Sequence, residues 1–253
     1  MKKAATFLTF LVTVSAISFS FINKPSPDTS NMESKAVSSA TMVRSENVHN
    51  HATEVNTISS NLYESLKLDE KGLSRTTLDV ALQGYLTLQE QGTLRNDSLL
   101  TVIDFSQSSR KKRFYLLDIK NNKLLENTYV AHAKNSGVDM AKSFSNVVGS
   151  EKSSLGFYLT KGTYTGKHGL SLKLAGLEEG YNDNAEARAV VVHGADYVNA
   201  GRVRSAYMGR SQGCPAVPMQ KYVQIINQIK NGSALFIYYP DTKYLNQSEI
   251  LNS

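Results

Sequence analysis

The spacing of hydrophobic positions predicts a helix between residues 74 and 92. Within "SRTTLDVALQGYLTLQEQG" the apolar side chains recur every three or four residues, as they do on one face of a helix. Ser74 is a favourable N-cap residue, and Gly92 suits the C-terminal end of a helix. The apolar face consists of Leu78, Ala81, Leu82, Tyr85 and Leu88. We expect this helix to serve packing and not chemistry.

From Leu99 onward the apolar runs become short, which is typical of β-strands. The runs read "LLTVIDF", "SLGFYLT", "LSLKLAG", "AVVVHGA" and "ALFIYYP", with Gly, Ser and Asn between them. The segment "RFYLLDIKNNKLLENTYVAHA" predicts a hairpin, because Asn121 and Asn122 suit a tight turn that needs positive φ.

A second helix is predicted after Pro218. One helical face carries Met219, Val223, Ile226 and Ile229, and Gly232 follows the last of them. The whole pattern therefore predicts a single mainly β domain, with one helix before the strands and one near the end. No internal repeat interrupts it.

The first 60 residues do not share this pattern. "MKK" is followed by an apolar stretch from Ala4 to Ile22, which predicts a signal peptide over residues 1–22. The alternative is an uncleaved anchor, since the stretch is nearly long enough to cross a bilayer core of about 30 Å. Residues 23–60 are rich in Ser, Thr and Asn, and we expect a disordered spacer there. The domain is then expected over residues 61–245, with a C-terminal tail over 246–253, in an exported protein of the periplasm or cell envelope.

The charge of the chain narrows the choice of partners. There are 28 Lys and Arg against 22 Asp and Glu, a net charge of +6, which weakly favours an anionic partner. No dense basic run with interleaved aromatic residues indicates nucleic-acid binding. No second apolar stretch of membrane length indicates contact with the membrane beyond the signal segment. The sequence gives no indication of the oligomeric state.

The chain contains one cysteine, Cys214, in the short polar segment "GRSQGCPAV". An exported protein with a single cysteine has no internal disulfide, so this thiol is buried and inert, paired with another chain, or reactive. Its neighbours Ser, Gln, Gly and Pro are turn formers, which favours a reactive thiol over a core residue. Since the thiolate is the nucleophile, such a cysteine needs a base or a positive field nearby.

His193 is the strongest candidate for that base. It ends the apolar run in "VVVHGAD", and the chain after it is long enough to return Cys214 to the same strand end. Gly213 permits a sharp turn that presents the thiol together with backbone N–H donors for an oxyanion. The cations Arg202, Arg204 and Arg210 lie between the two and would lower the thiol pKa or bind a carboxylate of a substrate.

Other polar residues receive structural interpretations. We expect His132 and His168 to be structural or surface residues, and Arg188 to pair with a carboxylate. A zinc site built from these two histidines, His193 and Cys214 lacks a compact ligand pair such as HxxxH or CxxC. We therefore predict no metal and no cofactor.

Several sequence blocks together resemble the murein L,D-transpeptidase catalytic domain family, a divergent branch of the YkuD-type L,D-transpeptidases. The blocks are "VAHAKNSG", "FSNVVGSEKSSLGFY", "GKHGLSLKLAGLEEGYNDNAEARAVVVHGADY" and "GRSQGCPAV", and they extend from about Leu73 to Pro240. The resemblance implies a YkuD-like β-sandwich. It also implies attack of the cysteine on a peptidoglycan stem tetrapeptide, release of D-Ala and a thioester. A second stem would resolve the thioester into a 3→3 cross-link, and water as the acceptor would make the protein an L,D-carboxypeptidase.

The resemblance also implies roles for individual residues. Cys214 matches the nucleophile and His193 the general base. Gly194 matches the small residue whose backbone helps to hold the imidazole ring. Ser211 and Gly213 match the turn beside the nucleophile, and the N–H groups of Gly213 and Cys214 are candidate oxyanion donors.

The expected substrate contacts are Arg210, Gln212 and Tyr197. Gln212 stands where most YkuD-type enzymes have a second histidine, and it cannot act as a base at neutral pH. The "PAV" run also replaces the asparagine that usually follows the nucleophile. Substrate positioning is therefore expected to differ from that of most members.

Two other interpretations compete with this one. A sortase-like transpeptidase would also pair Cys with His on a β-rich body, but it needs an arginine after the cysteine, and no Arg follows Cys214. A non-catalytic wall-binding module agrees with Gln212 and the positive charge, and it predicts a thiol of ordinary reactivity.

Overall fold

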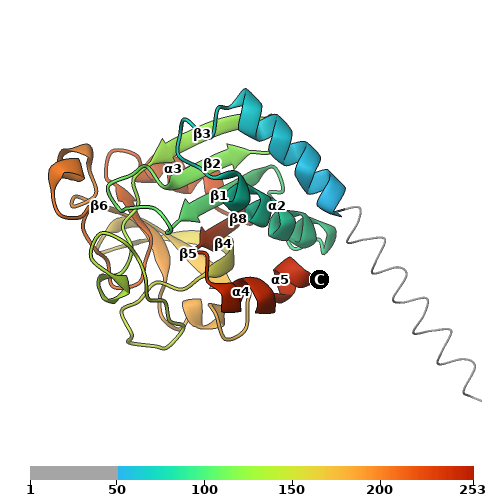
Figure 1. The fold of residues 1–253 in the computed structure, drawn as a ribbon. Helices are drawn as coiled ribbons and strands as arrows, with labels where there is room; N and C mark the ends of the chain where they lie inside the picture. Colours follow the sequence, from blue (N-terminus) through green and yellow to red (C-terminus); the bar gives the residue numbers. More distant parts are fainter. Residues whose placement is uncertain (1–50) are drawn as a thin grey trace, which may run out of the picture. The chain divides into compact units, whose positions relative to one another are not determined.

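The computed structural model describes residues 51–253, shown as a ribbon in Figure 1. A helix over residues 51–65 and α2 (Arg75–Glu90) come first. The strands are β1 (Leu99–Asp104), β2 (Phe114–Asp118), β3 (Lys123–Thr128), β4 (Gly156–Gly166), β5 (Gly169–Gly176), β6 (Val191–Ala195), β7 (Ala216–Pro218) and β8 (Ala234–Tyr238). Helix α3 (Tyr222–Ile229) lies between β7 and β8, and α4 (Thr242–Gln247) and α5 (Glu249–Asn252) end the chain. The short 3-10 helices are η1 (Lys134–Ser136), η2 (Asp183–Ala185) and η3 (Ala200–Arg204).

The eight strands form one sheet in the order β3-β2-β1-β8-β4-β5-β6-β7. Neighbours are antiparallel except for two parallel pairs, β1 with β8 and β6 with β7. This confirms the mainly β fold with a helix ahead of the strands and a helix after the cysteine. The strands β6 and β7 form one end of the sheet, and they carry the segments around His193 and Cys214.

The centre of the sheet is buried on both faces. Every residue of β1 and β8 is buried, which explains why these strands are near-continuous apolar runs instead of alternating ones. Helix α2 packs against β1 and β8, and α3 packs against β5 and β6. The approach of α2 is close, because a Cβ added at Gly84 would lie only 2.2 Å from Cζ of Phe157.

Helix α2 begins and ends where the sequence predicts. The Ser74 side chain accepts a hydrogen bond from Thr77 N at 3.0 Å, a cap that contributes about 1 kcal/mol to helix stability. Gly92 follows with φ +65°. All five residues of the predicted apolar face are buried. The predicted hairpin is also present as β2 and β3, with Asn122 at φ +50° in its turn.

The helix after the cysteine differs from the prediction in its start and its face. Residues Ala216–Pro218 form β7 and pair with β6, so α3 begins only at Tyr222. Its buried face is Ile225, Ile226 and Ile229, whereas Val223 is exposed. The pairing of β7 removes one turn from the predicted helix and thereby changes which residues face the core.

Both ends of the domain extend further than expected. Residues 51–60 of the predicted spacer are helical, and Val55 and Ser59 are buried in this helix. The C-terminal residues are not a free tail, because α5 buries Ile250 and Leu251, and Gln83 Nε2 on α2 donates to Leu251 O at 2.5 Å. The predicted signal peptide over residues 1–22, and the spacer up to residue 50, lie outside the described residues.

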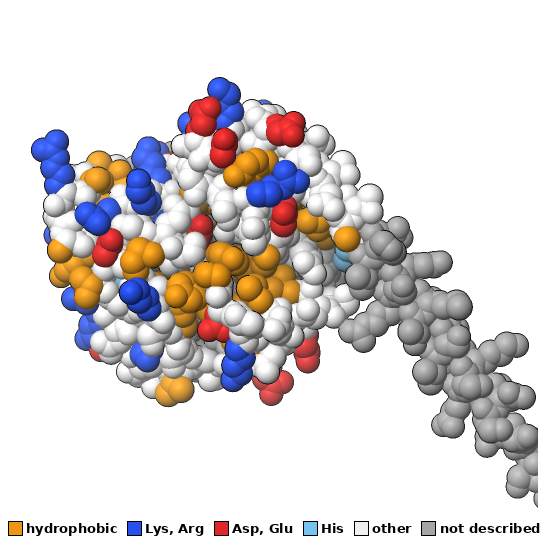
Figure 2. All heavy atoms as spheres, viewed as in Figure 1, with side chains coloured by type: hydrophobic (Ala, Val, Ile, Leu, Met, Phe, Trp, Pro, Cys, Tyr) orange, Lys and Arg blue, Asp and Glu red, His pale blue; other side chains and the backbone are white. Residues whose placement is uncertain are grey.

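Figure 2 shows one face of the molecule, on which hydrophobic side chains form a band across the middle and basic side chains are dispersed around it. Within residues 51–253, no helix combines the length and the apolar character needed to cross a membrane.

Candidate active site

The parallel pairing of β6 and β7 brings the cysteine segment beside the histidine strand. His193 pairs with Ala216, and Gly194 pairs with Val217. Cys214 lies two residues before Ala216, next to the start of β6. There the backbone N–H of Val191 lies 3.5 Å from Sγ of Cys214, and the thiol lies 3.7 Å from Ala189 O. The sheet itself therefore joins the two predicted catalytic residues.

The turn before Cys214 is held by Ser211. Its hydroxyl donates to Cys214 O at 2.6 Å and accepts from Gly213 N at 3.2 Å. Gly213 has φ +148°, a conformation that residues with a Cβ rarely adopt. Since Gly213 N–H already has an acceptor in the turn, the Cys214 N–H is the better candidate of the two for binding an oxyanion.

A third segment supports this turn from the other side. Ser211 N donates to His132 O at 2.9 Å, and Lys134 N donates to Ser211 O at 2.8 Å. Ala131 forms an antiparallel bridge with Ala216. The turn before Cys214 is thus held between β6 and residues 131–134.

His193 is buried in β6, with 3% of its surface exposed. Its Nδ1 lies 2.9 Å from Gly194 O, and because a carbonyl only accepts, Nδ1 carries the proton and Nε2 keeps its lone pair. Burial lowers the pKa of His193, the hydrogen bond to Gly194 O acts against this, and electrostatic interaction with His168 and Lys167 lowers it further. The ring is therefore neutral at neutral pH and has the proton state of a general base.

The environment of Cys214 has opposing effects on the pKa of the thiol. Burial raises its pKa, whereas the Val191 N–H, Arg188 and Lys167 lower it, and the net direction is upward. Sγ accepts a hydrogen bond from Val191 N and donates one to Ala189 O, and within residues 51–253 no hydrogen bond joins it to His193. The thiol is therefore protonated in this arrangement and needs a base for its activation.

The three predicted substrate contacts lie in different environments. Gln212 is exposed, two residues before Cys214 in the sequence. Arg210 donates to Lys134 O at 3.2 Å and to Gly137 O at 3.3 Å, and its guanidinium lies over the ring of Tyr207. Tyr197 is half-buried, and burial together with the Cys214 charge raises its pKa to about 12.

Gly194 allows close packing behind the histidine. A Cβ at this position would lie 2.6 Å from Sδ of Met219 and 2.7 Å from Cγ of Tyr222. Side chains from the segment before α3 and from its first residue therefore pack against the backbone that holds the His193 ring.

The other histidines have different surroundings. His132 is buried, with its Nδ1 2.7 Å from Nη2 of Arg113, and burial lowers its pKa to about 4. Arg113 is fully buried and also donates to Val130 O at 3.0 Å, so the pair fixes the backbone of the supporting segment 131–134.

His168 is exposed on the turn between β4 and β5, and its ring stacks on that of His193 at 4.4 Å. Within residues 51–253, no group of three or more His, Cys, Asp and Glu side chains is arranged to hold a metal ion.

Two residues close to the site were not predicted from the sequence. His168 was expected to be structural or a surface residue, and its contact with His193 required the β4–β5 hairpin. The expectation that Arg188 pairs with a carboxylate is wrong, because its hydrogen bonds go to serine and backbone oxygens instead. The position of Arg188 shortly before the "VVVHGAD" strand was the feature of the sequence that could have indicated its place near the site.

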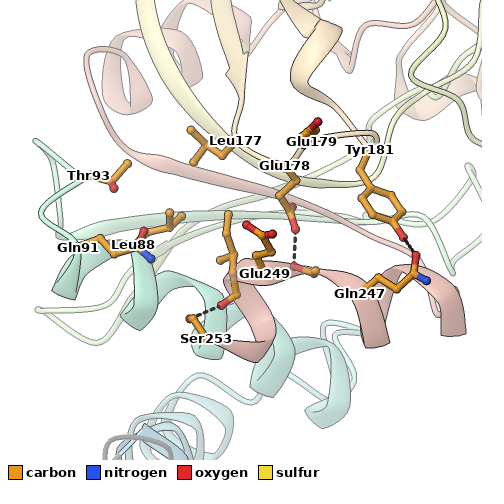
Figure 3. Close-up of a pocket in the computed structure, with 12 residues that line it drawn as sticks. Leu88, Gln91, Thr93, Leu177, Glu178, Glu179, Tyr181, Gln247, Glu249 and Ser253 are labelled. Atoms are coloured by element: carbon orange, nitrogen blue, oxygen red, sulfur yellow. Dashed lines mark hydrogen bonds between the residues drawn. The ribbon is translucent and has the colours of Figure 1, made fainter. Parts of the chain in front are cut away.

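A separate pocket of about 380 Å³ lies between the end of α2, the segment after β5, and helices α4 and α5 (Figure 3). Its buried carboxylate, Glu178, accepts from Phe157 N at 2.6 Å, from Tyr244 OH at 2.9 Å and from Ser248 Oγ. Figure 1 has β6 on the left and α5 on the right, so this pocket is not part of the Cys214 site. Glu178 anchors the C-terminal helices.

Solved structures similar to this chain include L,D-transpeptidases of low sequence identity. An L,D-transpeptidase from Mycobacterium smegmatis is 11% identical with a TM-score of 0.35, over 56% of this chain and 59% of that one. L,D-transpeptidase 3 from Mycobacterium tuberculosis is 9% identical with a TM-score of 0.36, over 56% of this chain and 61% of that one. The chain thus spans about three fifths of the solved chains it matches. No curated protein matches its sequence.

The match to a family model covers a larger share of the chain than the matches to solved structures do. It includes residues 69–238, from the segment before α2 to the end of β8, and so contains both β6 and the Cys214 turn. These boundaries agree with the resemblance inferred between Leu73 and Pro240. The chain belongs to the L,D-transpeptidase catalytic domain family.

Proposed function

We propose that this protein is an exported cysteine acyltransferase that forms 3→3 cross-links between peptidoglycan stem peptides. Cys214 is the nucleophile and His193 is the general base. The observation that carries this proposal is the β6–β7 pairing, which joins the strand of the neutral histidine to the turn of the single cysteine.

The reaction begins with transfer of a proton from Sγ to Nε2 of His193. Sγ then attacks the carbonyl of the third stem residue, and the Cys214 N–H stabilises the oxyanion. The bond from this carbonyl to the D-Ala nitrogen breaks, and the imidazolium returns its proton to the leaving amine. The product of this half-reaction is a thioester on Cys214 and free D-Ala.

The second half-reaction releases the enzyme. An amine of a second stem attacks the thioester, the C–S bond breaks, and the thiol regains its proton. The product is a 3→3 cross-link, or a trimmed tripeptide where water is the acceptor. Movement of Sγ away from Ala189 O toward Nε2, or one bridging water, would complete the proton path, since catalytic hydrogen bonds often tighten only with substrate bound.

Export and location in the cell envelope belong to the same proposal. They are supported by the basic start and the apolar stretch over residues 1–22 and by the family, whose substrate class lies outside the cytoplasm. Peptidoglycan stem peptides are the proposed partner.

Incubation of the purified full-length chain with a tetrapeptide muropeptide tests the proposal. We expect D-Ala release and a dimeric or trimmed product from the wild type, and neither from Cys214→Ala. Equal behaviour of the two proteins would exclude the reaction.

The competing function is a non-catalytic wall-binding module, which the raised pKa of Cys214 and the presence of Gln212 favour. The rate of Cys214 alkylation against pH separates the two. A thiol that ionises near pH 8.5, with no effect of His193→Ala, is the result expected for the binding module.

A further inference from the structure

The positive charge of Arg188 has no carboxylate partner among residues 51–253. Its Nη1 donates to Ser145 O at 2.8 Å and to Ser154 Oγ, and its Nη2 donates to Lys152 O at 2.5 Å and to Ser150 Oγ at 3.4 Å. All of these acceptors are neutral. Within the described part of the chain, the ion pairs between basic and acidic side chains do not include Arg188.

This charge lies directly behind the nucleophile turn. A Cβ built on Gly213 would be 3.7 Å from Nη2 of Arg188, and the guanidinium is half-buried. The side chains whose negative charge would favour the Arg188 cation are Tyr158 and Cys214. A cysteine ordinarily ionises before a tyrosine, so the thiolate is the natural counter-charge of Arg188.

Other charged or titratable groups also face Cys214. Lys167 comes from the β4–β5 turn, Tyr197 from the segment after β6, Tyr158 from β4, and His193 lies on β6. Lys167 is exposed, so water screens its charge. The half-buried Arg188 acts through a medium of lower dielectric constant, where a charge has a larger effect.

The hydrogen bonds of Arg188 also connect two supporting segments of the site. Ser145 N donates to Ser153 O at 3.0 Å, and Ser153 Oγ accepts from Ala133 N at 3.1 Å. Residues 145–154 are thereby tied to residues 131–134, which pair with Ser211. Arg188 therefore holds this outer segment through its hydrogen bonds to Ser145 O and Lys152 O.

We propose that Arg188 is a positioning residue of the site: its charge stabilises the Cys214 thiolate, and its hydrogen bonds hold residues 145–154 behind the nucleophile turn. The contribution of Arg188 to catalysis rests on the proposed function. The effect on the thiol itself exists whether or not the protein turns over a stem peptide.

The test measures alkylation of the full-length chain by iodoacetamide as a function of pH, and the single cysteine makes the signal unambiguous. The variants are Arg188→Met, which removes the charge, and Arg188→Lys, which keeps the charge but lacks the planar guanidinium with its several N–H donors. We expect the Met variant to ionise about one pH unit higher and to react about tenfold more slowly at pH 7. The Lys variant should stay within about 0.3 pH unit of the wild type.

A purely structural role would lower the unfolding temperature of both variants without separating their titration midpoints. An unchanged midpoint in the Met variant, or equal shifts in the Met and Lys variants, overturns the inference. Arg188→Gln is the uncharged variant to measure if the Met variant does not fold. A wild type that releases no D-Ala while the Met variant shows the shift refutes the proposed function and supports the effect of Arg188 on the thiol.

Discussion

His168 lies face to face with His193, with ring centroids 4.4 Å apart and ring planes at 26°. The two rings come from different elements, His168 from the exposed β4–β5 turn and His193 from buried β6. The stacked ring covers the His193 imidazole, and its electrostatic interaction with that ring lowers the pKa of His193. The tip of the hairpin therefore helps to keep His193 neutral.

Replacement of His168 by Ala is expected to raise the pKa of His193. The variant loses both the covering ring and the electrostatic interaction with His168, and both of these lower the pKa of His193 in the wild type. We expect an upward shift of about 0.5 pH unit in the imidazole titration measured by NMR, with the acidic limb of activity moving in the same direction. His168→Phe is the matched control, since it keeps a stacked ring without the charge and should give a smaller shift. An identical midpoint in all three proteins contradicts this role of the hairpin tip.

Gly213→Ala is expected to destabilise the nucleophile turn by about 1–3 kcal/mol, because φ of +148° is unfavourable for alanine. Space is not the cause, since the nearest atoms to the added Cβ are 3.7 Å away. Thermal unfolding measures the effect, together with slower alkylation of Cys214. Gly162→Ala is the control, because its added Cβ has no neighbour within 4 Å. Equal stability of the two variants would show that the turn tolerates a side chain.

The elements of the domain were largely predictable from local pattern. The buried strands β1 and β8 and the capped helix α2 each contain their own signal in a few neighbouring residues. The start of α3 was not predictable in this way, because β7 exists only through its pairing with β6. Residues 51–60 also look like polar spacer locally, and only the burial of Val55 against the rest of the fold makes them part of the domain.

The residues of the candidate site likewise fall into those that the sequence alone identifies and those that only the folded structure identifies. Cys214 and His193 stand out in the sequence because each residue type has a chemical meaning at the end of a strand or in a turn. Arg188 and His168 have that meaning only after folding, since one acts across a turn and the other across a hairpin. The pairing partner of a charged side chain is a tertiary property, which is why a carboxylate was wrongly expected for Arg188.

Two of the predicted substrate contacts are expected to respond differently to replacement by Ala. Gln212 is exposed, so Gln212→Ala should change the free energy of unfolding by less than about 0.5 kcal/mol. Arg210→Ala removes two hydrogen bonds to backbone carbonyls and should cost about 1–2 kcal/mol. Denaturant unfolding compares them, and KM for the stem peptide separates substrate contact from stability. A larger loss of stability in the Gln212 variant would contradict the assigned environments.

The buried Glu178 carboxylate is expected to make the stability of the domain depend on pH. Burial raises its pKa above 4.5, although three hydrogen bonds to the carboxylate act against this. The folded state therefore holds the proton at pH values where the unfolded state has released it. Between the unfolded and the folded pKa, the free energy of unfolding falls as the pH rises. Below the unfolded pKa, both states are protonated and this dependence disappears.

Glu178→Gln should remove this part of the pH dependence while keeping the C-terminal helices in place. Its oxygen can accept from Phe157 N and Tyr244 OH, and its amide can donate to Ser248 Oγ. Glu178→Ala leaves these groups without their partner and should cost about 1–3 kcal/mol at any pH. Urea unfolding of the three proteins, at a series of pH values upward from about 4, gives both quantities. If the Gln variant keeps the wild-type slope against pH, another group is responsible, and Glu178 is ionised throughout.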